Sequence, residues 1–449
     1  MSEVIRIKKG FNINLAGEAE KTISEIYPSQ CAIKPIDFHG VFPKLAVQEG
    51  DKVKTGSVLF WDKYHEEVLF TSPVSGTVAE IRRGAKRILL EIVIQNDGKD
   101  DYIEFGKADP EKLSREEIIE RMLKGGIWPV LRQRPYSVIA NSKDQPVAIF
   151  ISAFDTAPLA PDFDLIVHGH GDEFQAGLDV LGKLTEGTIY LNINGSEGIS
   201  KVFTNSSGVE ITQFRGKHPA GNVGTQIARL SPIKKGDIVW YLRPQEVLHI
   251  GRFFLQGRID STRIIALTGS EVKKPHYIRT KLGGAIREMI DTNVSGGKLR
   301  FISGNALSGR RIEKEGFVGF YDSQVTVLPE GDYYEFLGWA KMGLNKFSFS
   351  GTFLSSIFPK KKWRLDTNLH GAERAFVMTG KFEKVFGWDI YPLQLIKAIL
   401  VEDIDLMEKL GIYEVDEEDF ALCEFIDTSK TEIQDIVRYG LDLMRKEMS

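Results

Sequence analysis

Cysteine is scarce in this chain of 449 residues, which contains only Cys31 and Cys423. The two thiols lie far apart in the sequence, and neither has a second cysteine or a histidine at the spacing of a zinc site. Two cysteines cannot build a disulfide scaffold, and a lone thiolate cannot hold an iron–sulfur cluster. The sequence therefore predicts that the chain itself holds no metal.

Long apolar runs are also missing. A helix that crosses a membrane needs about 20 consecutive, mainly apolar residues, whereas the apolar run from Val147 to Ala153 is closed by Asp155. The first residues carry basic side chains but no apolar stretch followed by a cleavage site, so they do not read as a signal peptide. We therefore expect a chain that is soluble or is attached to a membrane through a partner.

An excess of positive charge is absent as well, because 58 Lys and Arg residues face 62 Asp and Glu residues and leave a net charge of −4. The chain as a whole therefore has no electrostatic attraction to nucleic acid or to an anionic membrane. What it does have is the composition of a folded protein, with 42% hydrophobic and 27% charged residues. Its length predicts about two to four domains, and the patterns below predict four in an α/β multidomain (α+β) fold.

The first predicted domain, residues 1–105, is a β-sandwich. Between Lys44 and Gln95, short apolar segments alternate with glycine turns, which favours strands over helices. These turns resemble those of the biotinyl/lipoyl-like barrel-sandwich, whose carrier modules present a modified lysine at a hairpin tip. Here the corresponding connection, WDKYHEEV, is long and acidic. We therefore favour a structural platform and keep a carrier module with a modified Lys63 as an alternative.

The second predicted domain, residues 106–256, is a Rossmann-like α/β layer. Apolar residues on one helical face predict a helix over 111–124. The strand AIFISAF, a helix over 174–183 and the strand TIYLNI then alternate, as in a doubly wound fold. Gly187 follows the second helix, where we expect a left-handed residue.

This α/β layer has no GxGxxG loop. The strand AIFISAF is followed by DTAPLAP, whose prolines lack the N–H donors that hold a pyrophosphate. Two other glycine clusters are present. The first, His168–Gly171, could be a turn before a helix, a phosphate-binding turn or half of a metal site. The second, His218–Thr225, ends in a threonine but lacks the GK[ST] of a P-loop, so it could be a structural loop. We favour the structural role for both.

The last two predicted domains differ in character. Residues 257–329 contain three strand patterns and the helix LGGAIREMID, which predicts a β-grasp, SLBB-like domain. Residues 330–449 begin with aromatic and basic loops and end in amphipathic helices, which predicts a helical C-terminal domain. An acidic group from Glu414 to Asp419 separates two of these helices. We expect it to be a solvated face or helix N-terminal charge.

Six segments, in order along the chain, carry a resemblance to a known family. They are the GAKR-containing segment 83–87, GIWPVLRQRPYS at 126–137, GLDVLGKLTEG at 177–187, HPAGNVGT at 218–225, NKFSFS at 345–350 and EEDFALC at 417–423. Together they resemble the A subunit of the sodium-translocating NADH:quinone oxidoreductase. This family is similar to the C subunit of the Rnf complex and to the flavoprotein subunit of complex I.

The resemblance implies a bacterial respiratory complex of six subunits that oxidises NADH, reduces ubiquinone or menaquinone, and exports Na⁺. The A subunit would be peripheral, on the cytoplasmic face of the inner membrane. Its partners would be the other five subunits, especially the membrane-embedded one with the quinone site. NADH, FAD, FMN, riboflavin and the 2Fe–2S centre would belong to those other subunits.

The resemblance also implies that the family's cofactor sites are degenerate in this chain. The complex I flavoprotein wraps FMN and NADH with a loop resembling GRGGAGFPTG, whereas the segment 126–137 places Trp128, Leu131 and two prolines there. Bulk replaces glycine, and prolines remove N–H donors. Cys423 stands alone where relatives place a cluster. We expect no catalytic residue and no bound redox cofactor, with an autonomous flavin-dependent NADH dehydrogenase as the alternative function.

Quinone is the one ligand that the resemblance leaves open. A quinone needs an apolar slot with one or two donors to its carbonyl groups. The candidate donors are His39, Arg134 and Tyr136, and the candidate walls are Phe38 and Trp128. The alternative is that these residues pack the interface between the β-sandwich and the α/β domain.

Overall fold

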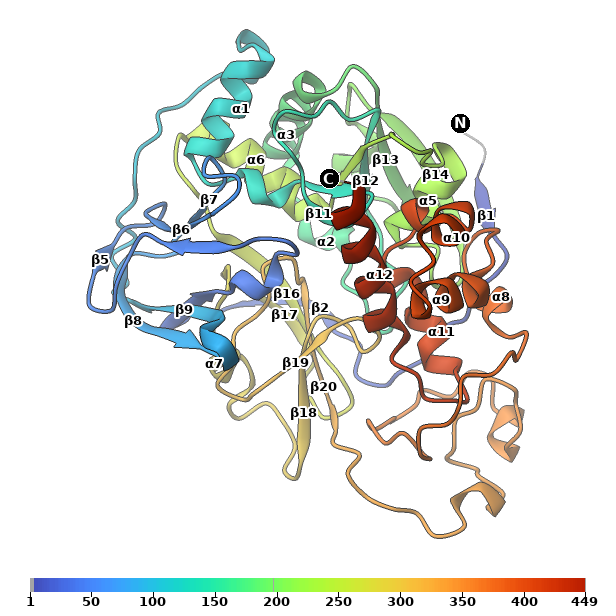
Figure 1. Ribbon diagram of the computed structural model, residues 1–449. Helices are drawn as coiled ribbons and strands as arrows, with labels where there is room; N and C mark the ends of the chain where they lie inside the picture. The colour runs from blue at the N-terminus through green and yellow to red at the C-terminus, as the bar shows by residue number, and fades with distance from the viewer. Residues whose placement is uncertain (1–3, 197, 449) are drawn as a thin grey trace.

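The computed structural model describes residues 4–196 and 198–448, which form four sheets and a C-terminal group of helices (Figure 1). The barrel-sandwich consists of two antiparallel sheets, β3-β9-β8-β5 and β4-β6-β7. Its strands are β3 (Gln30–Ile33), β4 (Pro43–Leu45), β5 (Lys52–Val53), β6 (Val58–Asp62), β7 (Leu69–Thr71), β8 (Gly76–Arg83) and β9 (Leu89–Asn96). Phe60 and Phe70 stack inside it with ring centroids 4.3 Å apart. The predicted strand-rich sandwich is confirmed.

The second sheet has the order β1-β14-β13-β12-β15-β10-β11. Its first five strands are parallel, and β10 pairs antiparallel with β15 and β11. The bounds are β1 (Ile5–Ile7), β10 (Arg132–Arg134), β11 (Val138–Ile139), β12 (Ala148–Ser152), β13 (Thr188–Asn194), β14 (Glu210–Gly216) and β15 (Val239–Leu242). Strand order reverses between β12 and β15, as in a doubly wound fold.

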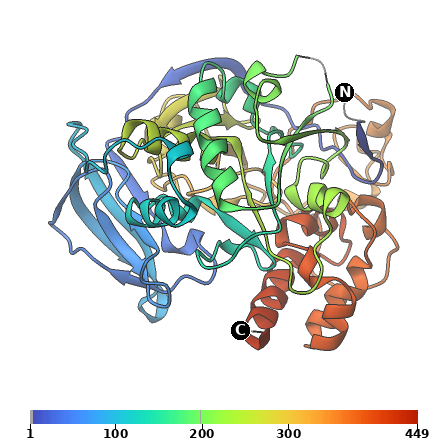
Figure 2. The same cartoon turned by 90° about the horizontal axis from the view of Figure 1, so that it is seen from above.

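Helices cover both faces of this sheet (Figure 2). They are α1 (Arg115–Lys124), α2 (Phe163–Ile166), α3 (Gly171–Leu184), α4 (Lys201–Thr204), α5 (Val223–Leu230) and α6 (Pro244–Gln256). Ile149 and Ile151 of β12 join the core that contains α3 and α6, whereas Phe150 joins the core that contains α5 and the C-terminal helices. Burial on both faces explains why β12 is continuously apolar.

The predicted helices of this layer are confirmed, but the role given to Gly187 is wrong. Ser114 caps α1 in a capping box, and Gly125 ends that helix. Gly187 is not among the residues with positive φ. A Cβ there would lie 1.9 Å from the backbone oxygen of Val147. Glycine is needed at this position for close chain approach, not for a left-handed conformation.

The β-grasp sheet has the order β19-β18-β20-β16-β17-β2. Its strands are β2 (Glu20–Glu25), β16 (Thr262–Thr268), β17 (His276–Lys281), β18 (Leu299–Ser303), β19 (Arg310–Ile312) and β20 (Gln324–Pro329). The three predicted strands are present. The predicted helix is a single turn, α7 (Arg287–Ile290).

The N-terminal segment belongs to neither sheet of the sandwich. β1 pairs in parallel with β14 of the α/β sheet, and β2 pairs in parallel with β17 of the β-grasp sheet. The predicted domain of residues 1–105 therefore begins with a segment that lies in two other sheets. These short strands have partners far along the chain, which a local pattern cannot reveal.

The C-terminal region begins with an irregular segment that forms the orange lobe at the lower right of Figure 1. Helices α8 (Phe382–Val385), α9 (Pro392–Leu400), α10 (Ile404–Lys409), α11 (Ala421–Ile426) and α12 (Ile433–Met448) follow. α12 crosses α9 closely, since a Cβ on Gly440 would lie 2.7 Å from Ile399. Within residues 4–196 and 198–448, no helix combines the length and apolar character that a membrane span requires.

Candidate functional site

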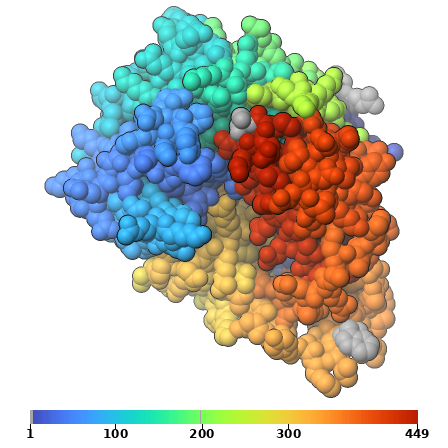
Figure 3. Space-filling model, viewed as in Figure 1, coloured from blue at the N-terminus to red at the C-terminus, as the bar shows by residue number. Residues whose placement is uncertain are grey.

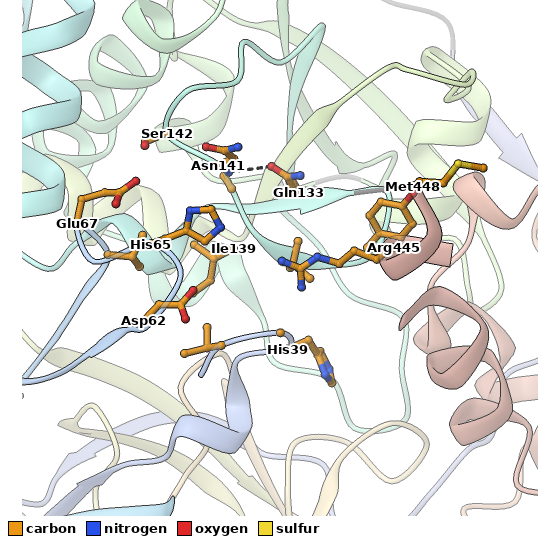
Figure 4. Close-up of a pocket in the computed structure, with 16 residues that line it drawn as sticks. His39, Asp62, His65, Glu67, Gln133, Ile139, Asn141, Ser142, Arg445 and Met448 are labelled. Atoms are coloured by element: carbon orange, nitrogen blue, oxygen red, sulfur yellow. Dashed lines mark hydrogen bonds between the residues drawn. The ribbon is translucent and has the colours of Figure 1, made fainter. Parts of the chain in front are cut away.

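A cleft of about 240 Å³ opens where the β-sandwich, the α/β sheet and α12 meet (Figure 4). It is lined by His39, Gly40, Val41, Asp62, His65, Glu67, Val68, Gln133, Tyr136, Val138, Ile139, Ala140, Asn141, Ser142, Arg445 and Met448. The sandwich side mixes charged or imidazole groups with two valines, the β10–β11 side mixes amide and aliphatic groups, and α12 contributes a cation. The cleft thus combines apolar wall with several hydrogen-bond donors.

Two of the predicted donors, His39 and Tyr136, line this cleft together. His39 Nε2 lies 3.0 Å from Glu417 Oε1, which orients the imidazole. Burial raises the pKa of Tyr136 to about 12. The Tyr136 phenol is therefore neutral at pH 7 and can donate a hydrogen bond to a carbonyl oxygen.

Arg445 brings a positive charge to the same cleft. A Cβ on Gly40 would lie 1.8 Å from Arg445 Nη1, so the Arg445 side chain occupies the space that the glycine leaves. Burial lowers the pKa of Arg445, and Asp62 and Tyr136 are among its electrostatic neighbours. The guanidinium stays charged at neutral pH, as arginine does in proteins.

Sequence reasoning missed Arg445, Asp62 and His65 as parts of this site. One signal was available for Arg445: it lies seven residues after Arg438 in a predicted helix, so both side chains share one helical face. No comparable signal marks Asp62, at the end of β6, or His65, in the β6–β7 connection.

Phe38 and Trp128, the predicted walls, do not line this cleft. The Phe38 ring packs on Phe70 of the sandwich at 4.6 Å and on Phe320 of the β-grasp domain at 4.8 Å. Trp128 is fully buried, and its Nε1 donates to the carbonyl oxygen of Ala140 at 2.7 Å. Both rings serve packing, but not at the interface that the alternative interpretation names: Phe38 joins the sandwich to the β-grasp domain, and the Trp128 contacts with Ala140 and Trp240 lie within the α/β domain.

Arg134 is not available as a ligand donor either. The side chain is fully buried in a cluster of carboxylates from the C-terminal domain. Its guanidinium nitrogens lie 2.8 Å from Asp419 Oδ2, 3.3 Å from Glu418 Oε1 and 3.6 Å from Asp416 Oδ2. A guanidinium with these partners ties the α/β sheet to the helical domain.

The prediction of a solvated acidic face at 414–419 is therefore wrong for Asp416 and Asp419, which are buried. The expectation of helix N-terminal charge is correct for Asp416, whose Oδ1 accepts a hydrogen bond from the N–H of Glu417. Burial raises the pKa of Asp419 to about 7. The positive charge of Arg134 opposes this shift, whereas the negative charges of Glu418 and Asp416 add to it. The cluster holds more carboxylates than Arg134 alone can balance.

The crevice at the reversal of strand order, between β12 and β15, holds charged side chains of the chain itself. Asp155, after β12, lies 3.2 Å from Arg243, after β15. The Asp155 carboxylate also accepts the N–H of Ala157 at 2.8 Å. In a dinucleotide fold this turn directs free N–H groups at phosphate. A carboxylate in that place repels phosphate, so these residues do not fit a bound nucleotide.

The two glycine clusters lie in turns that lead into α3 and α5. His168–Gly171 leads directly into α3, and His170 Nδ1 lies 3.3 Å from Glu173 of that helix. His218 is buried, and its Nδ1 lies 3.2 Å from Thr156 Oγ1. Within the described part of the chain, no group of three His, Cys, Asp or Glu side chains is arranged for a metal ion.

Comparison with known proteins identifies the family. Residues 5–97 match the model of the NqrA N-terminal barrel-sandwich hybrid domain, residues 113–259 that of the NqrA second alpha/beta domain, and residues 264–314 that of the NQRA C-terminal domain. The A subunit of Na(+)-translocating NADH-quinone reductase from Hahella chejuensis is 38% identical over 449 residues, covering 99% of this chain and 100% of that protein. The chain belongs to the NqrA family. The Pasteurella multocida protein of the same name is 39% identical over the same shares.

The family assignment confirms the resemblance and the fold class inferred from the sequence. NqrA proteins are named for an oxidoreductase complex that translocates sodium, so other subunits of that complex are partners of this chain. A solved NAD⁺-reducing NiFe-hydrogenase chain also matches, with a TM-score of 0.37 and 10% identity over 73% of this chain and 60% of that chain.

Proposed function

We propose that this member of the NqrA family is a peripheral, cytoplasmic-side component of the Na⁺-translocating NADH:quinone reductase that carries no redox cofactor of its own. NADH, the flavins FAD, FMN and riboflavin, and the 2Fe–2S centre would then be held by the other five subunits. The observation that supports this is the crevice between β12 and β15, where Asp155 and Arg243 pair and Asp155 uses a turn N–H. Phosphate binding there would need those donors free.

The first test is the absorption spectrum of the purified chain. A protein without a cofactor shows no flavin or iron–sulfur bands after gentle purification and does not oxidise NADH. A stoichiometric flavin would contradict the proposal and favour the alternative, an autonomous flavin-dependent NADH dehydrogenase. Intact mass spectrometry on the same sample tests the carrier alternative, since a modified Lys63 would add mass.

Quinone binding in the cleft of His39 and Tyr136 is the second part of the proposal. The space of about 240 Å³ is smaller than the roughly 300–1,000 Å³ of pockets that enclose a whole drug-sized ligand. It suits a single quinone ring whose tail extends outward. Tyr136 and Arg445 would donate to the ring carbonyls, while Val138 and Ile139 supply apolar contact.

The Tyr136→Phe variant tests this part directly. Loss of one donor to a carbonyl weakens binding of a short-tailed quinone by about tenfold, the equivalent of a hydrogen bond worth about 1–1.5 kcal/mol. Titration calorimetry on the full chain measures the change. The matched control is Tyr64→Phe, an exposed tyrosine of the sandwich that does not line the cleft. Equal affinities of the wild type and Tyr136→Phe would contradict quinone binding here.

A further inference from the structure

Residues 333–364, which we term the aromatic-basic loop, form the lower-right lobe of the molecule (Figures 1 and 3). Large apolar side chains project from it singly. Tyr334 is fully exposed, Phe336 is 87% exposed and Met342 is 77% exposed. Ile357 and Phe358 are also exposed. Single exposed apolar side chains are ordinary on a protein surface, so this loop is distinguished by having them on the same segment as a local excess of positive charge.

The loop is fixed to the body through its inner side. The Phe347 ring lies 5.5 Å from Trp363 and 5.8 Å from Phe11. The backbone of Trp363 bonds to Asn14 and Ala16, with N–O distances of 2.7 and 2.8 Å. Phe347 and Trp363 thus anchor the loop to the rest of the molecule. The exposed apolar residues of the loop take no part in this anchoring.

The loop is also strongly basic within an acidic chain. It contains six Lys or Arg residues and one acidic residue, Glu335, whereas the whole chain has a net charge of −4. Glu335 pairs with Lys341 and Lys346, Glu18 lies 3.1 Å from Lys362, and Glu271 lies 2.7 Å from Arg364. Three carboxylates therefore offset the six cations, and three positive charges remain. The basic residues are Lys341, Lys346, Lys360, Lys361, Lys362 and Arg364. Lys361 Nζ is held by neutral acceptors, the Leu344 carbonyl at 2.9 Å and Asn345 Oδ1 at 2.6 Å, which leave its charge unbalanced.

We propose that the aromatic-basic loop rests on the anionic surface of a lipid bilayer. Exposed aromatic and aliphatic side chains enter the interfacial layer, while neighbouring lysines pair with anionic head groups. The contact would fix the orientation of the chain at the membrane in addition to its contacts with partner subunits.

The charge favours lipid over a protein partner. Cytoplasmic loops of membrane proteins carry an excess of Lys and Arg. A loop with three surplus positive charges would be repelled by such surfaces, whereas anionic lipid head groups attract it. The chain as a whole lacks a basic excess, so any attraction is local to this lobe.

Vesicle flotation of the full chain tests the proposal. The vesicles contain phosphatidylcholine alone or phosphatidylcholine with phosphatidylglycerol. We expect binding only to the anionic vesicles, and weaker binding as NaCl increases. The triple variant Lys360→Gln, Lys361→Gln, Lys362→Gln should bind about a hundredfold more weakly, since each lysine near the surface contributes a factor of about five.

Two further variants separate local from general effects. Phe336→Ser with Met342→Ser and Ile357→Ser should also weaken binding, because the apolar contact is lost. The matched control, Lys52→Gln with Lys54→Gln and Lys99→Gln, removes the same charge from exposed positions of the sandwich and should bind as wild type does.

Three outcomes would overturn the proposal. Wild-type chain that floats equally with both vesicle types, or with neither, has no anionic lipid site. Equal losses in the two lysine variants would assign binding to general charge. Loop variants that bind vesicles normally but fail to copurify with the membrane subunits would assign the loop to a protein contact.

Discussion

Arg134 is a buried cation whose charge is balanced by carboxylates from a distant part of the chain. Its three partners lie about 280 residues later, in the turn before α11. A buried ion pair contributes little net stability compared with an apolar pair, but removal of one partner leaves unbalanced charge in the interior. Mutation of Arg134 should therefore lower the free energy of unfolding by far more than the ion pairs contribute to it on balance.

Replacement of Arg134 by Met should lower the free energy of unfolding by about 3–5 kcal/mol. The variant leaves the buried carboxylates of Asp416 and Asp419 without the guanidinium of Arg134. Urea denaturation measures the loss. Arg215→Met, at an exposed position, is the matched control and should change stability by less than about 0.5 kcal/mol. Similar midpoints for the two variants would show that Arg134 does not balance the cluster.

The same cluster predicts a pH dependence of stability. Burial raises the pKa of Asp419 from an ordinary 3.8 to about 7, so the folded state holds this proton more tightly than the unfolded state does. The resulting stability is fully present below about pH 4 and is lost as the pH rises through about 7. Asp416, whose pKa is lowered because hydrogen bonding and cations outweigh burial, acts in the opposite sense at acid pH.

Comparison with Asp419→Asn isolates this contribution. Between pH 4 and 7, the unfolding free energy of the wild type should fall by about 1–4 kcal/mol relative to that of Asp419→Asn, which has no proton to lose. Denaturation curves at several pH values measure the difference. If the unfolding free energies of the two proteins changed with pH in parallel, the pKa of Asp419 would be the same in the folded and the unfolded state, which would contradict this prediction.

At the scale of single residues, the sequence predicted part of the candidate quinone site. His39 and Tyr136 were chosen because their side chains can donate to a quinone carbonyl, and both line the same cleft. Arg134 was chosen for its donor chemistry, but chemistry alone does not reveal whether counterions already occupy a side chain. The partners of Arg134 were visible in the sequence as an acidic group, although nothing local linked the two.

At the scale of elements, Gly187 makes a close contact where the paired strands β13 and β12 begin, since it directly precedes β13 and its neighbour Val147 directly precedes β12. A Cβ on residue 187 would lie 1.9 Å from the Val147 oxygen. Gly187→Ala should lower the free energy of unfolding by about 1–3 kcal/mol, because the backbone has to move apart. Gly182→Ala within α3 is the control, since a Cβ there meets no atom within 4 Å. That control should be neutral or stabilising, and equal destabilisation of both would refute the contact argument.

Elements with a strong period were predictable, and short ones were not. α3 and β12 each bury a repeated face that is visible in the sequence. α7 was expected to be longer, but only Arg287–Ile290 is helical. β1 and β2 were missed, because three to six residues carry too weak a pattern and their partners are distant in the sequence.

At the scale of the whole molecule, the order of sandwich, α/β layer, β-grasp sheet and C-terminal helices was predictable from the sequence. The way these parts interlock was not. Arg134 joins the α/β sheet to the C-terminal helices, Phe38 joins the sandwich to the β-grasp domain, and the cleft of His39 lies where three parts meet. Such contacts depend on packing between segments that share no local sequence pattern.

The pairing of the N-terminal segment has a consequence for biosynthesis. β1 and β2 leave the ribosome first, but their partners β14 and β17 lie about 200 and 250 residues later. At 5–20 residues per second, roughly 10–50 s pass before both partner strands have been translated. β1 has no partner until β14 is made and β2 none until β17 is made, and the α/β and β-grasp sheets close only after more than half of the polypeptide has emerged.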